Sequence, residues 1–520
     1  MKIKLIYPPS CGVIVNSKRR LTPLPNGLCV LIAFLRKYNY VVEIQDLDVR
    51  FNCHSISLNF LRMRRAISDY RNRQIRAGCY TGIADRSNNL LAEALLNHID
   101  IKGCDVVGIG VHSDEQILTT LLLAEKIKKE YGLPIVIGGP YVTLFAQFFF
   151  DKYKFIDYAI VGEGEKSLLQ LVECLQKKCS LKDIPSLWYR ENSVTKHNKR
   201  IFFNIEEQGC PEFDDLPLNQ YKRYMNGSWV MPIPYMVSSG CVNRCAFCTY
   251  PSLDGAWQIK SLDKVLEEIV LLKQRYKRNV FFFEDANFNV SYQYVEKLCS
   301  ELIKRKVNIV WQARVYSDVL DEQLIAKMRK AGCMRLYWGI ESGSSGTLEK
   351  MRKKVNIPHA ANMIRYASQL GIYNTVYLIV GYPYDTVDSL EKTALFLKKN
   401  ASFIYAIDAI PLGIYPGSYI HENPKQEGIV IKKTRSSFFT YSYAYEEIEP
   451  VSAKQKKLNE CARGKVMHYG NKYINFKHFR FPMNIMVRLF GKPFSNRYSS
   501  GFFPKKKTAR LLNKNIINRG

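Results

Sequence analysis

The chain has 520 residues, of which 47% are hydrophobic and 24% charged, and these proportions exclude disorder over most of its length. At roughly 150 residues per domain, the length predicts two to four domains. The 76 Lys and Arg residues against 47 Asp and Glu give a net charge of +29, which indicates an acidic partner such as nucleic acid, an anionic membrane or a phosphorylated substrate.

Short apolar runs alternate with amphipathic segments over residues 1–180. Strands that are apolar throughout and separated by helices imply a parallel sheet covered on both faces. We therefore expect a doubly wound, flavodoxin-like α/β domain, which binds ligands at the carboxyl ends of its strands. The predicted strands are Lys2–Tyr7, 41–47, 105–111, 134–137 and 158–161.

Three loops at those strand ends, 23–27, 138–140 and 162–165, are rich in Gly and Pro. Glycine lets a backbone approach a ligand closely, although each loop taken singly also fits an ordinary turn. Their recurrence at one sheet edge favours a ligand site. The Arg-rich stretch 50–89 interrupts the alternation and is predicted to be a solvated helical insertion.

A hairpin and a linker are predicted over residues 181–232, with strands at 186–190 and 200–204 and an interdomain linker at 212–217. The alternation of strand and helix then resumes over 233–415. Six such units predict a partial (β/α)6 barrel with its active site at the C-terminal strand ends. The predicted strands are 234–239, 279–284, 308–315, 334–341, 372–380 and 402–410.

Three cysteines, Cys241, Cys245 and Cys248, follow the first barrel strand at spacings of four and three. A loop can wrap three thiolates around a metal centre. Zinc is one alternative, but a structural zinc site needs four protein ligands, and the nearest other cysteines in the chain are Cys210 and Cys299. Three cysteines fit an iron–sulfur cluster better, with one iron open to an outside ligand.

This CxxxCxxC motif, with the aromatic Phe247 before its last cysteine, resembles that of the radical S-adenosylmethionine (radical SAM) enzymes. The resemblance implies that Cys241, Cys245 and Cys248 hold a 4Fe–4S cluster and that SAM chelates the open iron. In that family, electron transfer from the reduced cluster cleaves SAM to a 5′-deoxyadenosyl radical, which abstracts a substrate hydrogen atom.

Further polar residues lie at the ends of successive barrel strands and match the SAM-binding segments of that family. Each charged residue taken singly fits a salt bridge at the barrel mouth equally well, and their recurrence is what favours a site. The residues that the resemblance implies for SAM binding are Phe247, Glu284, Asp285, Arg314 and Glu341.

An open α/β domain ahead of such a barrel is similar to the cobalamin-binding subgroup of the family. Its usual cobalt-ligating histidine would align with Leu24, which cannot coordinate a metal; His112 is a substitute ligand or an ordinary hydrogen-bonded histidine. The residues that the resemblance implies for cobalamin binding are Pro25, Gly27, Ser113, Gly138, Gly139, Tyr141, Gly162 and Glu163.

The region 416–520 is predicted to be basic and mainly helical. Residues 453–520 carry 17 Lys and Arg against a single acid, Glu460, so more than half of the net charge lies there. Cations interleaved with aromatic and aliphatic residues fit peripheral contact with an anionic inner membrane surface, RNA binding, or a solvated tail.

The uncharged run 133–150 is the minimum length for a membrane span, but Pro134, Gly138, Gly139 and Pro140 interrupt it. The cysteines of the first half, such as Cys29 and Cys53, are scattered rather than arranged as a disulfide framework. We therefore expect a cytoplasmic protein with no integral span.

These features together predict a cobalamin-dependent radical SAM enzyme, most simply a methyltransferase acting on an unactivated carbon or phosphorus of a natural-product or lipid-like substrate. A radical SAM cyclase or rearrangement enzyme and an RNA-modifying enzyme of the methylthiotransferase type are the alternatives. The resemblance implies a small-molecule or lipid substrate and an electron donor such as flavodoxin or ferredoxin, with nucleic acid favoured less.

Overall fold

The computed structural model describes residues 1–10, 24–53, 82–177, 179–221, 223–225, 228–432 and 444–447, together with Glu460, Arg463, Gly464 and Val466. The chain divides into two compact units, Met1–Ile474 and Asn475–Gly520, and the second lies outside the described residues. Most of the predicted Arg-rich insertion and of the basic tail also falls outside them.

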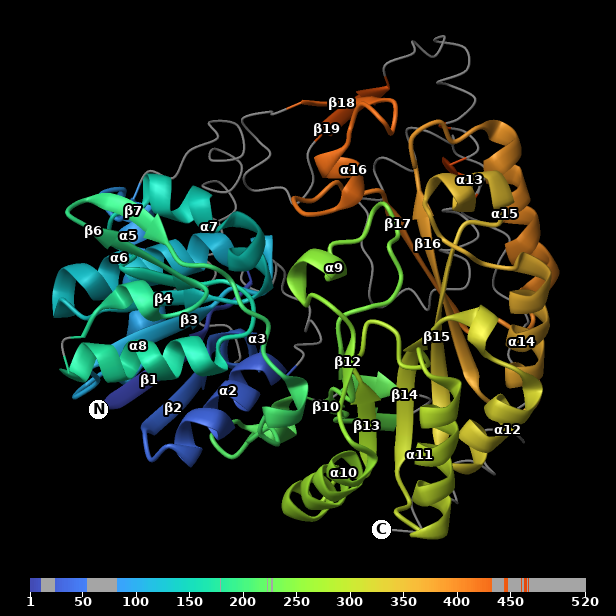
Figure 1. Cartoon of the computed structure of the whole chain (residues 1–520), viewed down its shortest axis with the longest axis horizontal. Coiled ribbons are helices and arrows are strands. Elements are labelled where there is room, and N and C mark those ends of the chain that lie inside the picture. Colours follow the sequence, from blue (N-terminus) through green and yellow to red (C-terminus); the bar gives the residue numbers. More distant parts are fainter. Residues whose placement is uncertain are drawn as a thin grey trace. The chain divides into compact units, whose positions relative to one another are not determined.

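The first sheet has seven strands in the order β2-β1-β3-β4-β5-β6-β7 (Figure 1). Pairing from β2 to β5 is parallel, and the order 2-1-3-4-5 is that of flavodoxin-like folds, which confirms the predicted doubly wound domain. The strands are β1 Lys2–Tyr7, β2 Val41–Asp46, β3 Val106–Gly110, β4 Ile135–Gly138, β5 Tyr158–Ile160, β6 Leu187–Glu191 and β7 Val194–His197.

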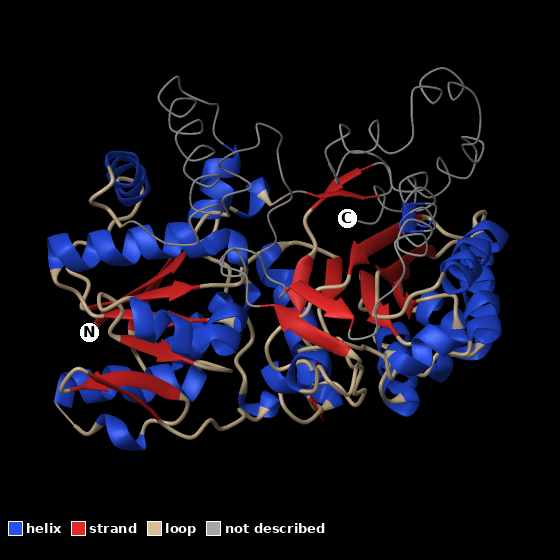
Figure 2. Ribbon diagram, turned by 90° about the horizontal axis from the view of Figure 1, so that it is seen from above, coloured by secondary structure: helices blue, strands red, loops and turns tan. Residues whose placement is uncertain are grey.

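Helices cover both faces of this sheet (Figure 2). Leu5 and Ile44 pack on one side with apolar residues of α2 and α8, whereas Ile6 and Ile109 pack on the other with residues of α5, α6 and α7. Alternate residues of the central strands therefore enter different cores, which is why β3 and β4 are apolar throughout. The helices are α2 Asn26–Lys37, α3 Leu47–Cys53, α5 Arg86–Leu96, α6 Ile117–Tyr131, α7 Pro140–Lys152 and α8 Glu165–Lys177.

The predicted hairpin forms, but it extends the first sheet, since β6 pairs antiparallel with β5 and with β7. The prediction of its second strand at 200–204 is wrong, because β7 ends at His197. Asn192 and Ser193 both have positive φ values, of 51° and 66°. A two-residue turn of this kind returns the chain at once, so the second strand begins at Val194.

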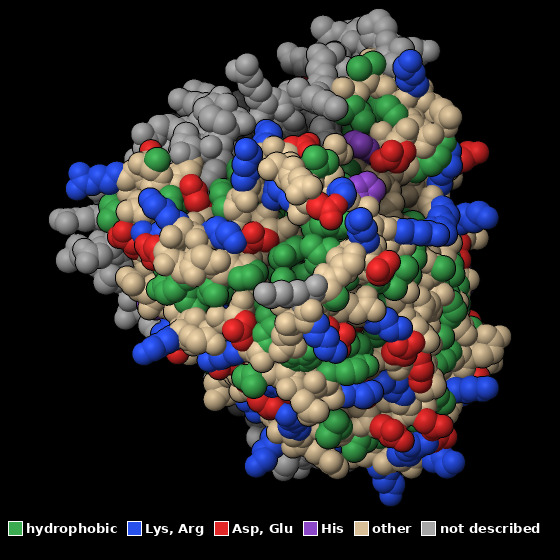
Figure 3. Space-filling model, turned by 60° about the vertical axis from the view of Figure 1, so that its left-hand side comes forward, with side chains coloured by type: hydrophobic (Ala, Val, Ile, Leu, Met, Phe, Trp, Pro, Cys, Tyr) green, Lys and Arg blue, Asp and Glu red, His purple; other side chains and the backbone are tan. Residues whose placement is uncertain are grey.

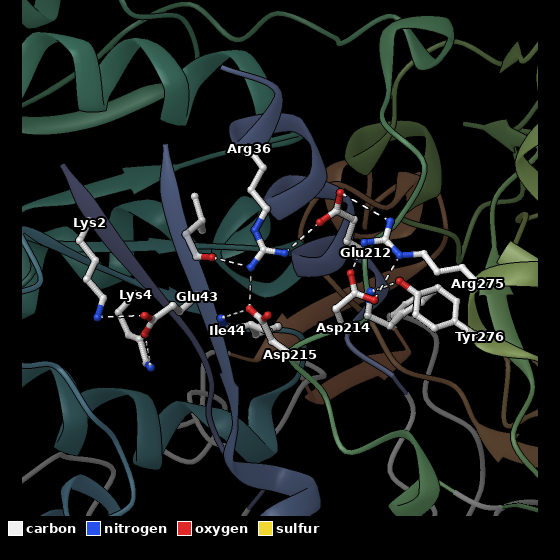
Figure 4. A network of polar contacts seen from close by, with 12 residues as sticks. Lys2, Lys4, Arg36, Glu43, Ile44, Glu212, Asp214, Asp215, Arg275 and Tyr276 are labelled. Atoms are coloured by element: carbon white, nitrogen blue, oxygen red, sulfur yellow. Dashed lines mark hydrogen bonds and ion pairs between the residues drawn. The ribbon is translucent and has the colours of Figure 1, made fainter. Parts of the chain in front are cut away.

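Residues 212–221 connect the first sheet to the second, and they contact a helix beside each of the two sheets (Figure 4). Arg36 of α2 donates to Glu212 and Asp215 at 2.8 Å each, while Arg275 of α10 (Leu262–Tyr276) pairs with Glu212 at 3.8 Å and also with Asp214. Ion pairs therefore connect the start of this segment to one helix beside each sheet.

The second sheet has six parallel strands in chain order, which confirms the predicted partial barrel. They are β10 Ile233–Tyr235, β13 Val280–Phe283, β14 Val310–Val315, β15 Cys333–Glu341, β16 Tyr373–Val380 and β17 Ala406–Pro411. The helices that follow are α10 Leu262–Tyr276, α11 Tyr292–Lys304, α12 Glu322–Lys330, α13 Ser345–Lys350, α14 Ile357–Gln369 and α15 Val387–Asn400.

Smaller elements complete the described part of the chain. Beyond residue 416 it contains α16 Tyr419–Glu422 and an antiparallel pair, β18 Ile429–Lys432 with β19 Ala444–Glu447, while the rest of the predicted mainly helical region lies outside the described residues. No helix of the described part is long and apolar enough to cross a membrane. Lys and Arg are interspersed with Asp and Glu over the face shown in Figure 3.

Candidate active site

The three cysteines lie in the loop between β11 (Ser238–Ser239) and the short helix α9 (Tyr250–Leu253). Cys241 and Cys245 are buried, Cys248 is partly buried, and all three are free thiols. The loop begins at Gly240, whose φ is +75° and where an added Cβ would lie 2.7 Å from the Ala256 carbonyl oxygen. Only glycine fits that tight entry into the loop.

Backbone hydrogen bonds fix the cysteine loop to distant segments. The Ala246 N–H donates to the Met351 carbonyl, and the Ile420 N–H donates to the Ala246 carbonyl, both at 2.9 Å. Asp285 accepts from the backbone N–H and the hydroxyl of Ser238, each at 2.5 Å, at the start of the loop. These contacts leave the thiol groups themselves available for a ligand.

Three free thiols on one loop fit an iron–sulfur cluster that keeps one iron open to an outside ligand. Burial raises the pKa of Cys245, and raises that of Cys248 to about 12, so both favour the neutral thiol until a metal displaces the proton. No three His, Cys, Asp or Glu side chains converge on one point anywhere in the described part of the chain. The cysteine thiols are therefore not arranged as a preformed site for a single metal ion.

Glu341 ends β15 beside the cysteine loop, in a left-handed conformation with φ of 63°. Burial raises the pKa of its carboxyl, and Lys353, at 3.9 Å, opposes that rise. Lys353 and Glu341 both interact electrostatically with Cys245. Sequence reasoning missed Lys353, since nothing in its local sequence distinguishes it from its basic neighbours.

The other residues predicted to bind SAM have different surroundings. Arg314 donates to the Glu284 carbonyl at 3.0 Å and lies over the Phe282 ring. Asp285 is fully buried, and Ser238 and the Val237 N–H use both its oxygens, so the structure shows it holding the cysteine loop. Phe247 packs against the apolar cluster that contains Met351 and Tyr382.

Residues 24–27 form the first of the predicted cobalamin loops. Leu24 is buried in the core, and Pro25 caps α2. Gly27 is exposed, and an added Cβ there would meet no atom within 4 Å. Asn26, which sequence reasoning missed, donates to Glu284 of the barrel at 3.2 Å, and its buried Oδ1 has no hydrogen-bond partner.

The ends of β1 and β3 meet at the point where the strand order reverses. The Gln116 side chain donates to the Pro8 carbonyl and accepts from the His112 N–H, both at 2.8 Å, so it joins the two loops. Ser113 caps the short helix that follows β3. The side chain of His112 is exposed, yet the surrounding protein lowers the pKa of the imidazole by desolvation.

The loop after β4 is held close to β3. Gly139 has φ of +105°, and an added Cβ would lie 2.8 Å from the Val111 carbonyl oxygen. Gly138 precedes it at the end of β4. Tyr141 is 1% exposed and stacks on Phe145 at 4.5 Å, so this predicted cobalamin residue belongs to the core beneath the loop.

Glu163 and Arg200 link the loop after β5 to the cysteine loop. Arg200 passes over Gly162 and donates to the carbonyls of Ser252 and Leu253 at the end of α9. Glu163 lies 3.8 Å from Arg200, and burial raises the pKa of its carboxyl to about 7. Glu163 Oε2 and Arg200 Nε are both buried without a hydrogen-bond partner.

Two kinds of comparison with known proteins agree with this geometry. Residues 235–397 match the model of the radical SAM superfamily. An uncharacterized methyltransferase of Pyrococcus horikoshii is 28% identical over 327 residues, covering 61% of this chain and 69% of its own length. An anaerobic magnesium-protoporphyrin IX monomethyl ester cyclase of Rubrivivax gelatinosus is 24% identical over 337 residues, covering 61% of this chain and 59% of its own length.

Among solved structures, the radical SAM methyltransferase TsrM of Kitasatospora setae, with cobalamin and a [4Fe-4S] cluster bound, superposes with a TM-score of 0.63. The match covers 94% of each chain at 15% sequence identity. Such a likeness shows a shared fold over both sheets.

Proposed function

The chain belongs to the radical SAM superfamily, and on that premise we propose that it is a cobalamin-dependent methyltransferase. Its target would be an unactivated carbon or phosphorus of a small-molecule or lipid-like substrate. The proposal draws on the cysteine loop, the doubly wound domain and the methyltransferases among the proteins it resembles.

The observation that carries the proposal is a contact between the carboxyl ends of the strands in the first sheet and those of the barrel strands. Asn26, at the first cobalamin-type loop, donates to Glu284, at the end of β13 in the barrel. The unpartnered Oδ1 of Asn26 is a buried acceptor that a bound group can satisfy, because an unmet buried polar atom is costly. A corrin at one edge would therefore adjoin SAM at the other.

The chain's own residues would hold and orient these groups. When bound, the cluster with SAM supplies radical chemistry and cobalamin supplies a transferable methyl group. Cys241, Cys245 and Cys248 would hold the cluster, and Lys353 and Glu341, which both interact electrostatically with Cys245, would contact the SAM carboxylate and amino group. The exposed Gly27 leaves room at the first-domain edge for a large flat ligand.

The proposal is tested by anaerobic reconstitution of protein produced with hydroxocobalamin. We expect one 4Fe–4S cluster and one corrin per chain, and a CD3 group transferred from labelled SAM to the substrate. Protein that binds the cluster but never retains corrin would contradict cobalamin dependence. Protein loaded with zinc and free of iron would contradict the cluster itself.

A cyclase is the second candidate, because the Rubrivivax gelatinosus relative is one. The two functions differ in their SAM products. Methyl transfer gives S-adenosylhomocysteine together with 5′-deoxyadenosine, whereas cyclisation without methyl transfer gives 5′-deoxyadenosine alone. The ratio of the two nucleosides, measured by chromatography, distinguishes them.

A further inference from the structure

The strands β15, β16 and β17, which lie side by side in the second sheet (Figure 1), carry fully buried residues on one face and partly exposed residues on the other. Trp338, Val376 and Ile407 belong to the buried face that packs in the main core with α14 and α15. The alternate residues Tyr337, Tyr377 and Asp408 keep accessible surface and form the inner face of the barrel.

Asp408 lies beside Tyr377 in the register of β16 and β17. Its carboxylate is partly buried, and the described part of the chain gives it no hydrogen bond and no ion pair. Burial raises the pKa of this carboxyl, and none of the described cations offsets that effect. A half-buried carboxylate without a partner is costly, so a positive or hydrogen-bond-donating ligand would stabilise it.

The cations nearest along this face are engaged elsewhere. Arg314 donates to the Glu284 carbonyl and interacts with the Tyr377 hydroxyl. Arg335 lies over the Tyr405 ring at 4.8 Å. None of the charged residues described on β14, β15 or β16 therefore neutralises Asp408.

Tyr377 adjoins Asp408 across the strand pair, and Tyr337 adjoins Tyr377 on the other side. Tyr337 and Tyr377 stack with centroids 5.8 Å apart and planes inclined by 17°, and the Tyr337 hydroxyl is fixed by Gln312 at 2.8 Å. Thr375 lies on β16 opposite Tyr337 of β15, and its buried Oγ1 has no hydrogen-bond partner. Aromatic faces beside a carboxylate are the usual surroundings of a bound ammonium group.

We propose that Asp408 binds a protonated nitrogen of the substrate, with Tyr337 and Tyr377 contacting the carbon atoms next to it. This inference rests on the proposed function, because it places the substrate on the inner face of the radical SAM barrel. The substrate class is then a cationic amine, and the methyl-accepting atom lies on the side of the molecule that faces the cysteine loop.

The test measures ligand binding to the reconstituted holoenzyme with a matched pair of probes, phenethylammonium and its neutral analogue 2-phenylethanol. At millimolar concentrations we expect the ammonium to raise the Tm of the wild-type protein more than the alcohol does. Asp408→Asn should weaken ammonium binding about 10-fold, which corresponds to about 1.4 kcal/mol, and should leave alcohol binding unchanged. Asp408→Glu should restore part of the difference.

The control Asp388→Asn removes an exposed acid that pairs with Lys392 on α15, and it should bind both probes as the wild type does. Equal binding of the two probes, no binding of the ammonium, or an equal loss in Asp388→Asn would overturn the proposal.

SAM also carries cationic groups, so the same titration is repeated with saturating SAM. Ammonium binding that persists with SAM and is lost in Asp408→Asn assigns Asp408 to the substrate. Competition between the two ligands, with a 10-fold loss of SAM affinity in Asp408→Asn, would assign it to SAM and overturn the proposal. Cofactor content and SAM cleavage, measured on the same samples, report separately on the proposed function.

Discussion

The two sets of strand ends that face each other in this protein are held in different ways. At the barrel edge, the backbone of Ala246 and the hydrogen bonds from Ser238 to the Asp285 carboxylate fix the cysteine loop, and these bonds do not involve the thiols. At the first-domain edge, side chains such as Gln116 and Arg200 join the loops. At the barrel edge, we therefore expect that the cluster can be removed with little loss of folding stability. At the first-domain edge, we expect that substitutions change both ligand binding and folding stability.

The largest effect expected from this difference follows Cys248→Ala. The substitution should abolish the cluster and all SAM cleavage, while the Tm of the protein before reconstitution falls by no more than a few degrees. Iron analysis, the visible spectrum and thermal unfolding measure the two properties. Cys299→Ala, in the buried face of α11, is the matched control and should keep the cluster. Unfolding of Cys248→Ala would break the comparison.

Arg200→Gln should reduce methyl transfer roughly 10- to 100-fold at unchanged cluster content. Arg200 joins the Glu163 loop to the end of α9, and small displacements between reacting groups cost rates of this size. The measurement is the ratio of methyl transfer to 5′-deoxyadenosine formation.

Arg190→Gln provides the matched control for Arg200. Arg190 also donates to carbonyls, at Phe150 and Tyr153, but entirely within the first domain. It should lower stability without changing that product ratio. The same ratio change in both variants would show that Arg200 acts only through stability.

Gly139→Ala should destabilise the protein by about 2–3 kcal/mol, because its positive φ and the nearby Val111 carbonyl exclude a Cβ. Gly27→Ala is the control, since a Cβ there meets no neighbouring atom. Because Gly27 lies in α2, the substitution should leave the unfolding free energy unchanged or raise it by up to about 1 kcal/mol, but it should reduce the corrin retained. Denaturant unfolding and the corrin absorbance measure the two effects.

The smallest effect concerns the pH dependence of stability. Folded Glu163 keeps its proton up to a pKa of about 7 against an ordinary value of 4.5, so unfolding releases a proton between these values and the unfolding free energy falls as pH rises. The fall should be about 2 kcal/mol, and Glu163→Gln should remove that part of it. Parallel unfolding curves for the two proteins from pH 4.5 to pH 7 would contradict the burial of this carboxyl.

The parallel strands of both sheets were predictable from sequence because short, mostly apolar runs alternate with amphipathic segments. The cysteine loop was predictable because its three ligands are close in sequence.

Contacts between distant segments could not be predicted. Asn26 and Glu284 are separated by 258 positions, and no local pattern connects them. Nothing in the local sequence distinguishes Arg200 from a surface cation, because its position over Gly162 depends on the folded chain. The second hairpin strand was misplaced because the turn at Asn192 depends on backbone angles that those residue types permit but do not require.

The ion pairs of the linker have a practical consequence for dividing this protein. Glu212 is shared by Arg36 and Arg275, and Tyr221 donates to the buried Asp46 at 2.6 Å. A truncated protein that begins or ends between residues 212 and 232 would leave these charges and the apolar surface beneath them exposed. Separate production of the two halves should therefore yield aggregation, whereas co-expression of the fragments should allow them to reassociate.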